Sequence, residues 1–182
     1  MVLSTGALLS RDGFQWTLHG DITTFQPKVT PNSTNGLCEP SVVELESGEI
    51  LMYLRSGTSR HWESRSADKG ATWSAPKPGP LVGHNTPTAL WRVEGSATIV
   101  AVWNHSPVTR FPLSVAASRD GGRTWGPARI LDRGEEGLQA SYPGITQAKD
   151  GKLVAVWQRQ RADGGRDIRW ARFDPVWVVT GQ

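Results

Sequence analysis

The sequence predicts an all-β fold, a β-propeller of four-stranded antiparallel blades. The first observation is a repeat: residues 66–73 (SADKGATW) return 52 positions later as residues 118–125 (SRDGGRTW). A shorter version occupies residues 10–16 (SRDGFQW). A period of roughly 50 residues is typical of propellers, in which each repeat is one blade.

The second observation is a hairpin pattern that accompanies this repeat. Residues 39–55, 86–104 and 142–158 each read as an apolar strand, a Gly-containing turn and a second apolar strand, with a Pro near the start of each unit. A third strand, the repeated segment and a short fourth strand follow the first two of these units. We therefore expect three blades at about 38–82, 84–132 and 140–178, and a partial blade at 1–24.

Composition is the third observation. The 182 residues include 20 Gly, 12 Pro and nine Trp, which suits short strands joined by turns. We expect no amphipathic helix of useful length. The net charge of +3 comes from scattered basic residues, which argues against a nucleic-acid partner. We expect no membrane span, because no stretch of about 18 apolar residues occurs. No signal peptide is expected, and the compartment stays open.

The repeated segments, residues 66–73 and 118–125, are called the repeat turns below. Asp and Gly favour a tight turn, the Asp can accept hydrogen bonds from nearby backbone amides, and the Trp inserts into a core. We therefore expect them to be scaffold. They join strands three and four, which places them on the face opposite the open ends of the hairpins.

One partial blade and three fuller ones make a single domain, 1–182, that does not close a ring by itself. An open arc leaves apolar blade faces and strand edges exposed. The chain is therefore expected to be the C-terminal portion of a larger ring or to close by association.

Hairpin symmetry predicts which residues gather at the open ends. Glu39 and Arg55 are equidistant from the turn centred on Ser47, and Tyr142 and Gln158 are equidistant from Asp150. In a regular hairpin such residues face each other across the strands. The equivalent position of the middle unit, with the loop that follows it, adds two more residues. The predicted rim comprises Glu39, Arg55, Asn104, Arg110, Tyr142 and Gln158.

These side chains suit a particular chemistry. Two guanidinium groups can hold a carboxylate bidentately, and a Tyr beside a carboxylate can be an activated nucleophile. Each residue also has a plain structural interpretation: a cross-strand ion pair for Glu39 and Arg55, an aromatic packing group for Tyr142, and a solvated loop charge for Arg110.

The same residues resemble the sialidase (neuraminidase) superfamily. The repeat turns look like its Asp boxes, also called BNR repeats. Residues 39–56 resemble the sialidase segment that holds the catalytic Glu and the second of three arginines. Residues 110–113 resemble the segment of the third arginine, and residues 142–143 that of the nucleophilic Tyr. The order and spacing agree along nearly the whole chain.

The resemblance implies a six-bladed propeller that releases terminal sialic or related acidic sugars with retention, using a Tyr nucleophile. Tyr142 would attack the anomeric carbon, and Glu39 would take its proton. Arg55 and Arg110 would clamp the sugar carboxylate of an acidic-sugar glycoconjugate.

Asn104 and Gln158 would complete the substrate contacts. Gln158 stands where many sialidases have a Glu that orients the first arginine, so a neutral amide there puts the placement of that arginine in question. The family's first arginine and its acid/base Asp have no counterpart before Cys38, so we expect the chain alone to be inactive.

Two alternatives to a sialidase-like enzyme remain. One is a non-catalytic carbohydrate-binding or interaction propeller, and the other is a structural fragment without a function of its own. No cofactor or metal is expected, because the four His and the single Cys show no ligand spacing and no Gly-rich phosphate loop precedes a helix.

Overall fold

The computed structural model describes residues 5–21 and 36–181, so residues 1–4 and 22–24 of the predicted partial blade lie outside the described part. The described residues form strands and one short helix. The strands are β1 (Gly6–Leu9), β2 (Thr17–Asp21), β3 (Cys38–Glu44), β4 (Ile50–Arg55), β5 (Arg60–Ser66), β6 (Lys77–Val82), β7 (Ala89–Arg92), β8 (Ile99–Asn104), β9 (Leu113–Ser118), β10 (Arg129–Asp132), β11 (Ala140–Gln147), β12 (Leu153–Gln160) and β13 (Arg166–Phe173), and the helix is α1 (Pro175–Thr180).

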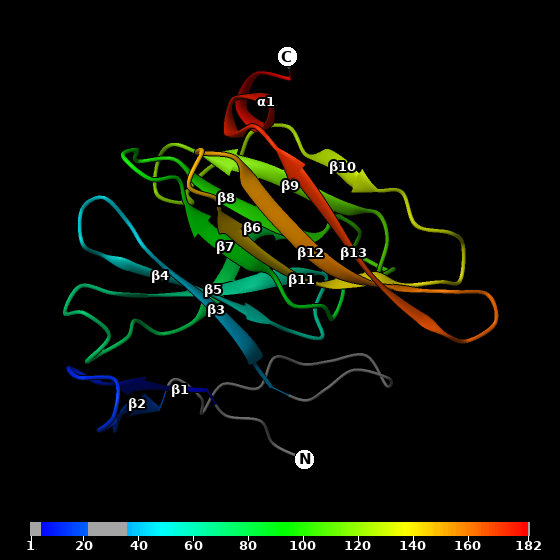
Figure 1. Ribbon diagram of the computed structural model, residues 1–182. Helices are drawn as coiled ribbons and strands as arrows, with labels where there is room; N and C mark the ends of the chain where they lie inside the picture. Colours follow the sequence, from blue (N-terminus) through cyan, green and yellow to red (C-terminus); the bar gives the residue numbers. More distant parts are fainter. Residues whose placement is uncertain (1–4, 22–35, 182) are drawn as a thin grey trace.

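Four antiparallel sheets follow one another along the chain. Their strand orders are β1-β2, β3-β4-β5-β6, β7-β8-β9-β10 and β11-β12-β13. Figure 1 shows this succession from the β1–β2 hairpin to the sheet β11–β13 and α1. The all-β prediction is confirmed, and two sheets have the four strands expected within 38–82 and 84–132. Within each sheet every strand pairs with the strand next to it in the chain, so each sheet is a series of hairpins.

Strand alternation explains how the sheets pack. Leu51 and Tyr53 of β4 belong to the core shared with the sheet β7–β10, whereas Met52 and Leu54 belong to a core on the other face. Successive side chains of a strand point to opposite faces, so a strand between two cores is apolar throughout. Strand β8 shows this most clearly, because all six of its residues are buried. A third core joins β8 and β9 to β12.

The four-strand expectation is wrong for 140–178. The sheet there has three strands, and α1 follows β13 instead of a fourth strand. The Asp174 carboxylate caps the helix by accepting a hydrogen bond from the Val176 amide (2.8 Å), Pro175 occupies the first turn, and Gly181 ends it in a left-handed conformation. Val178 is buried in the core beside β9. These caps close a helix at the place where the repeat pattern predicts a fourth strand.

The repeat turns have the expected hydrogen bonds. In residues 66–73 the Asp68 carboxylate accepts from the Thr72 hydroxyl (2.6 Å), the Thr72 amide (2.8 Å) and the Ser66 hydroxyl (2.8 Å), and the Gly70 amide donates to Ser66 Oγ (2.8 Å). These bonds, led by that from the Thr72 hydroxyl, lower the pKa of Asp68 to about 2.

The second repeat turn, residues 118–125, repeats this network. The Asp120 carboxylate accepts from the Thr124 hydroxyl (2.6 Å), the Thr124 amide (2.9 Å) and the Ser118 hydroxyl (2.8 Å). The bonds to Thr124 lead in lowering the pKa of Asp120 to about 2. The turns are therefore closed by their own side chains.

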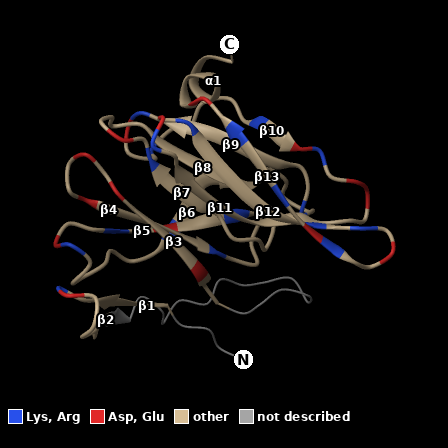
Figure 2. Ribbon diagram, viewed as in Figure 1, with Lys and Arg blue, Asp and Glu red and all other residues tan. Residues whose placement is uncertain are grey.

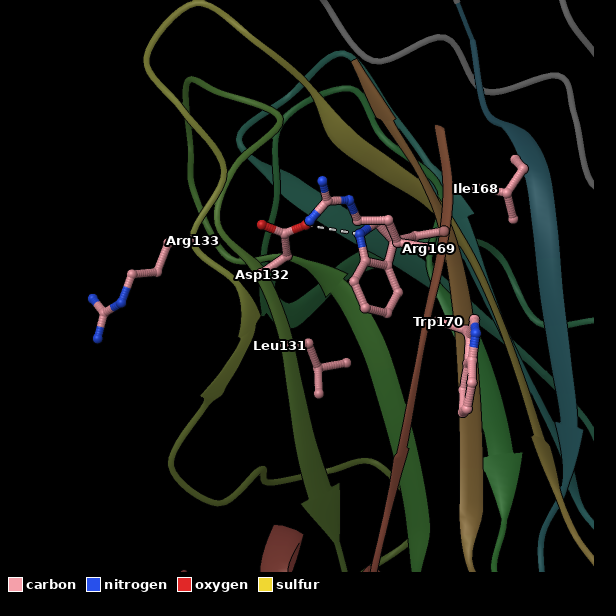
Figure 3. A pocket seen from close by; sticks show the side chains of 7 residues that line it. Leu131, Asp132, Arg133, Ile168, Arg169 and Trp170 are labelled. Carbon is pink, nitrogen blue, oxygen red and sulfur yellow. Dashed lines mark hydrogen bonds between the residues drawn. The ribbon is translucent and has the colours of Figure 1, made fainter. Parts of the chain in front are cut away.

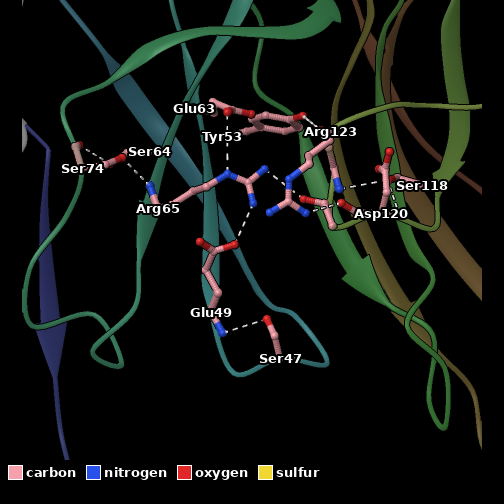
Figure 4. A network of polar contacts seen from close by, with 12 residues as sticks. Ser47, Glu49, Tyr53, Glu63, Ser64, Arg65, Ser74, Ser118, Asp120 and Arg123 are labelled. Atoms are coloured by element: carbon pink, nitrogen blue, oxygen red, sulfur yellow. Dashed lines mark hydrogen bonds and ion pairs between the residues drawn. The ribbon is translucent and has the colours of Figure 1, made fainter.

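The second turn is also locked to the preceding sheet (Figure 4). The Tyr53 hydroxyl donates to the Gly122 carbonyl (3.3 Å) and accepts from Trp125 Nε1 (3.1 Å). The Arg65 guanidinium donates to the Gly121 carbonyl and to Glu49 Oε2 (2.9 Å each). Because Tyr53 is fully buried, its pKa is raised. The repeat turn thus fixes one sheet against the next.

Strand β4 links the repeat turns to the opposite end of the fold. Its first residue, Ile50, pairs with Ser66 of a repeat turn, whereas its last residue, Arg55, pairs with Cys38. At about 3.3 Å per residue the strand separates these ends by about 16 Å. The predicted rim residues therefore lie at the opposite end of the strands from the repeat turns.

Charged residues of both signs are interspersed along strand ends and loops (Figure 2). Most basic strand residues have an acidic neighbour, as Arg65 of β5 has in Glu49 and Glu63. The expectation that nucleic acid is not a partner stays a prediction. Within residues 5–21 and 36–181 no helix is long and apolar enough to cross a membrane.

Candidate active site at the open ends of the hairpins

Two β-bulges shape the candidate site. Between β3 and β4 the register moves from the pair Cys38–Arg55 to Ser41–Tyr53, so two residues bulge out. Between β11 and β12 it moves from Ser141–Gln158 to the pair Gly144–Val156. The bulged residues are Glu39-Pro40 and Tyr142-Pro143, the same position in two hairpins.

The predicted hairpin symmetry is therefore wrong by one residue. Glu39 does not face Arg55, and Tyr142 does not face Gln158; Cys38 and Ser141 do. The cause is a Pro with no backbone N–H, which interrupts the ladder and favours a bulge. The bulge moves the Glu and Tyr side chains out of the sheet's regular alternation.

Backbone strain marks the same place. Glu39 (φ 46°), Asn85 (φ 41°) and Tyr142 (φ 58°) are three of the four non-glycine residues with positive φ in the described part; the fourth is Lys69 of a repeat turn. This left-handed conformation costs an L-residue about 1–2 kcal/mol. Such strain gathers at functional sites, where surrounding contacts hold it.

The first half of the site is an ion pair with one buried partner. Arg55 is 6% exposed, and its Nη1 donates to Glu39 Oε1 at 2.7 Å. Burial opposes the charge of Arg55, but the hydrogen bond to Glu39 and the charge of Glu39 outweigh it. A hydrogen bond that Arg55 donates to Tyr142 adds to them, so the pKa of Arg55 is raised. The Glu39 side chain stays 41% exposed. A fixed cation thus sits beneath an accessible carboxylate.

The second half of the site pairs a cation with a phenol. Arg110 Nη1 lies 3.5 Å from the Tyr142 hydroxyl, and the Arg110 guanidinium carbon lies 5.6 Å from the centre of the Tyr142 ring. The Gln139 amide oxygen accepts from the same Nη1 (3.1 Å), which holds the guanidinium in place. Tyr142 is 43% exposed. Its hydroxyl is therefore accessible and flanked by positive charge.

The two halves form one site. Glu39 and Tyr142, with Pro40 and Pro143, line a single open depression between the hairpins, and Pro87 of the middle unit lines it too. The structure thus brings together four predicted residues, Glu39, Arg55, Arg110 and Tyr142. An accessible carboxylate and a phenol at one depression, with a cation against each, can bind an anion and move a phenolic proton.

Asn104 and Gln158 lie deeper than expected. Asn104 is fully buried, and its Nδ2 donates to the Ala140 carbonyl (2.8 Å), so it braces the start of β11. Gln158 is half-buried and pairs with Ser141. Four buried side-chain atoms at this end have no hydrogen-bond partner in the described structure: Thr86 Oγ1, Asn104 Oδ1, Ser141 Oγ and Gln158 Nε2.

Sequence reasoning missed Asn85 and Gln139. Asn85 Oδ1 accepts from Arg55 Nε (2.9 Å), and the Asn85 carbonyl accepts from Arg110 Nη2 (3.0 Å). Neither residue belongs to a motif. The one available signal was that Asn, beside a Thr-Pro turn, readily adopts the left-handed conformation.

A second depression lies beside the edge of β13 (Figure 3). Its buried carboxylate, Asp132, accepts from Trp157 Nε1 (2.9 Å), the Gly134 amide (2.9 Å) and Arg159. Burial raises its pKa, but these hydrogen bonds outweigh burial and the pKa is lowered. A general acid needs a raised pKa, so Asp132 is a structural anion.

Exposed apolar side chains cover the outer face of the last sheet. Val156, Ile168 and Trp170 are 43, 77 and 66% exposed, and β12–β13 register places them together. Within residues 5–21 and 36–181, no three or more His, Cys, Asp or Glu side chains form a group that could hold a metal ion.

Fold and geometry together define an all-β repeat protein whose candidate site lies at the open ends of its hairpins. A family model described as a BNR repeat-like domain matches residues 8–168. The chain belongs to this family, and the predicted relation to the sialidase/BNR superfamily is confirmed. No curated protein sequence matches the chain.

Solved structures support the same fold. The intramolecular trans-sialidase from Ruminococcus gnavus matches with a TM-score of 0.70 and 19% identity, over 95% of this chain and 38% of that one. NanB sialidase from Streptococcus pneumoniae matches with a TM-score of 0.72 and 17% identity, over 94 and 27%. An alpha-L-arabinofuranosidase from Fusarium graminearum has a TM-score of 0.61 and 17% identity, over 75 and 45%. The chain thus spans less than half the length of these relatives.

Proposed function

We propose that this chain carries the nucleophile side of a sialidase-like exo-glycoside hydrolase site that acts, with retention, on terminal sialic or related acidic sugars. One observation carries the proposal. The accessible Tyr142 hydroxyl lies against Arg110, and Glu39, paired with Arg55, lines the same depression. The sialidases among the structural relatives support the substrate class.

Each residue has a role in the proposed reaction. Arg55 and Arg110 hold the sugar carboxylate, because guanidinium groups match its geometry bidentately. The Tyr142 oxygen attacks the anomeric carbon, and Glu39 accepts the phenolic proton. Because the phenol is neutral before attack, it avoids the repulsion that a carboxylate nucleophile would meet from the substrate carboxylate.

Asn104 and Gln158 keep supporting roles in this proposal. Asn104 is too deeply buried to touch a sugar directly, and it holds the backbone that leads into Tyr142 through Ala140. Gln158 pairs with Ser141 across β11 and β12, and strand alternation puts it on the same face as the exposed Val156. It would meet groups supplied by the next part of a ring.

We also propose that a complete site needs further sheets. A six-bladed ring, with an acid/base Asp and another arginine, would be completed by additional blades or by association with another chain. The exposed Val156, Ile168 and Trp170 supply an apolar face for such contact. The chain alone is then inactive on substrates whose leaving group must be protonated.

An activated donor tests the chain by itself. In 2,3-difluoro-sialic acid the anomeric substituent is fluoride, which leaves without protonation. The Tyr142 oxygen forms a bond to the anomeric carbon as the carbon–fluorine bond breaks; fluoride departs and Glu39 takes the proton. We expect peptide mass spectrometry to find the fluorosugar on Tyr142 and Glu39→Gln to slow labelling by about 10²-fold or more.

Tyr142→Phe is the matched control, because it keeps the ring and loses only the oxygen. Labelling that persists in this variant, or wild-type protein that never labels, would contradict the nucleophile role. Wild-type protein that binds N-acetylneuraminic acid without labelling would favour the alternative, a non-catalytic carbohydrate-binding module. That alternative draws on the same observation, since two arginines can hold a carboxylate without chemistry.

A further inference from the structure

Asn85 lies between the two arginines and contacts both. Its side-chain oxygen accepts from Arg55 Nε at 2.9 Å, and its backbone carbonyl accepts from Arg110 Nη2 at 3.0 Å. The outer sides of these guanidinium groups are held separately, Arg55 by Glu39 and Arg110 by Gln139. One residue of the loop before β7 therefore joins cations that come from β4 and from the loop before β9.

The conformation of Asn85 makes both contacts available at once. With φ at 41°, its backbone carbonyl is directed to one arginine while its side chain reaches the other. Asn adopts this left-handed conformation more readily than other non-glycine residues. Glycine would adopt it too, but it has no side-chain acceptor. Asn is thus suited both to the backbone and to the hydrogen bond.

The neutrality of Asn85 matters for an anionic ligand. Glu39 already balances one of the two positive charges, so the pair Arg55 and Arg110 keeps one in excess. An amide orients a guanidinium without cancelling its charge. A carboxylate at position 85 would orient Arg55 equally well, but it would neutralise the remaining charge and repel a bound carboxylate.

We infer that Asn85 is a positioning residue that sets the two guanidinium groups as one receptor for a single carboxylate. It does so through its side-chain oxygen on Arg55 and its backbone carbonyl on Arg110. The assignment of the ligand as a sugar carboxylate rests on the proposed function. The positioning role itself rests on the two hydrogen bonds and the left-handed backbone.

The test separates orientation from charge in the full 182-residue chain. Orientation is measured by NMR as the hydrogen-exchange rate of the Arg55 Nε–H group. Ligand binding is measured by titration with N-acetylneuraminic acid, with its uncharged methyl ester as the control ligand. Asn85→Gly keeps the backbone conformation and removes the acceptor. Asn85→Asp keeps the acceptor and adds a negative charge.

For Asn85→Gly we expect faster exchange at Arg55 and about tenfold weaker binding of the acid, the size of one hydrogen bond to a charged group. For Asn85→Asp we expect exchange to stay slow while binding of the acid falls by about tenfold or more and binding of the ester does not. A merely structural residue would not separate the two readouts. Lys69→Gly, which removes the left-handed non-glycine residue of a repeat turn, is the matched control and should change neither.

Exchange at Arg55 that is unchanged by Asn85→Gly would overturn the positioning role. Equal binding of the acid by Asn85→Asp and wild type would overturn the role of neutrality. If wild type binds neither sugar while exchange follows the expected pattern, the proposed substrate class is overturned and the positioning role is supported. Thermal melting of each variant establishes that it is folded.

Discussion

The two ends of the strands differ in how they close the chain. At the repeat turns, left-handed positions fall mainly on glycine, including Gly70 and Gly122, and the Asp carboxylates are satisfied by their own turns. At the site end, three non-glycine residues, Glu39, Asn85 and Tyr142, also take left-handed conformations.

Buried polar atoms follow the same division. Of the six described buried side-chain atoms without a partner, four lie at the site end and none lies in residues 66–73 or 118–125. One end is built for stability, and the other keeps strain and unpaired polar groups where chemistry is proposed. Evidence of function is therefore found where local rules are broken, and not where the motif repeats.

The largest expected effect is at the glycines of the repeat turns, where a substitution tests whether this end stabilises the fold. A Cβ on Gly122 would lie 2.7 Å from Leu51 Cδ2, and φ there is 81°, so Gly122→Ala adds a clash to left-handed strain. We expect a loss of about 3 kcal/mol in the free energy of unfolding, measured by urea denaturation. Gly13→Ala, at φ 78° with nothing within 4 Å of the new Cβ, should lose only about 1 kcal/mol. Equal losses of stability in the two variants would contradict the scaffold role of residues 118–125.

Acid should destabilise the two ends of the strands in different pH ranges. His61 is fully buried beside Thr88, and burial lowers its pKa to about 4. Because the unfolded state then binds a proton that the folded state does not, stability is lost as the pH falls from about 6.5 to 4, by roughly 3 kcal/mol at most.

The Asp carboxylates of the repeat turns respond at lower pH. Their lowered pKa values, about 2 for Asp68 and Asp120, give stability that is present above the ordinary Asp pKa and lost as the pH falls toward 2. The melting temperature should therefore depend less on pH than in wild type between pH 6.5 and 4 in His61→Gln. In Asp120→Asn its pH dependence should differ from wild type only below about pH 4. A His61→Gln profile identical to wild type would rule out this assignment.

A smaller effect distinguishes strained from ordinary strand positions. Replacing a strand residue by Gly is normally worse than replacing it by Ala by about 0.5–1 kcal/mol. At Tyr142, with φ at 58°, we expect the reverse, with Tyr142→Gly more stable than Tyr142→Ala by about 1 kcal/mol. The control pair is Gly and Ala at Val156 of the same sheet, which should keep the normal order. Denaturant midpoints of the four variants provide the measurement, and a normal order at Tyr142 would show that the bulge carries no strain.

Several features could be predicted because they are local. The repeat turns follow from Ser, Asp, Gly and Thr at fixed spacing, and the hairpins follow from apolar runs on either side of Gly turns. The gathering of Glu39, Arg55, Arg110 and Tyr142 at one end followed from counting along the hairpins. The bulges did not follow, since counting assumes an unbroken ladder, although Pro40 and Pro143 were the available signal. The caps of α1, Asp174 and Gly181, were a second local signal, here for a helix, although the repeat pattern predicted a fourth strand.

By itself the sequence determined the all-β class, the strand order and the end of the strands at which the polar residues gather, because these depend on periodicity and turn chemistry within each repeat. Only the tertiary structure decided that Glu39 and Tyr142 project from bulges, that Asn104 is a buried brace and that Asn85 joins two arginines. The contacts of Asn85 and Asn104 link residues 25–36 positions apart. Such pairings depend on how one sheet packs against the next, which no local pattern of residues specifies.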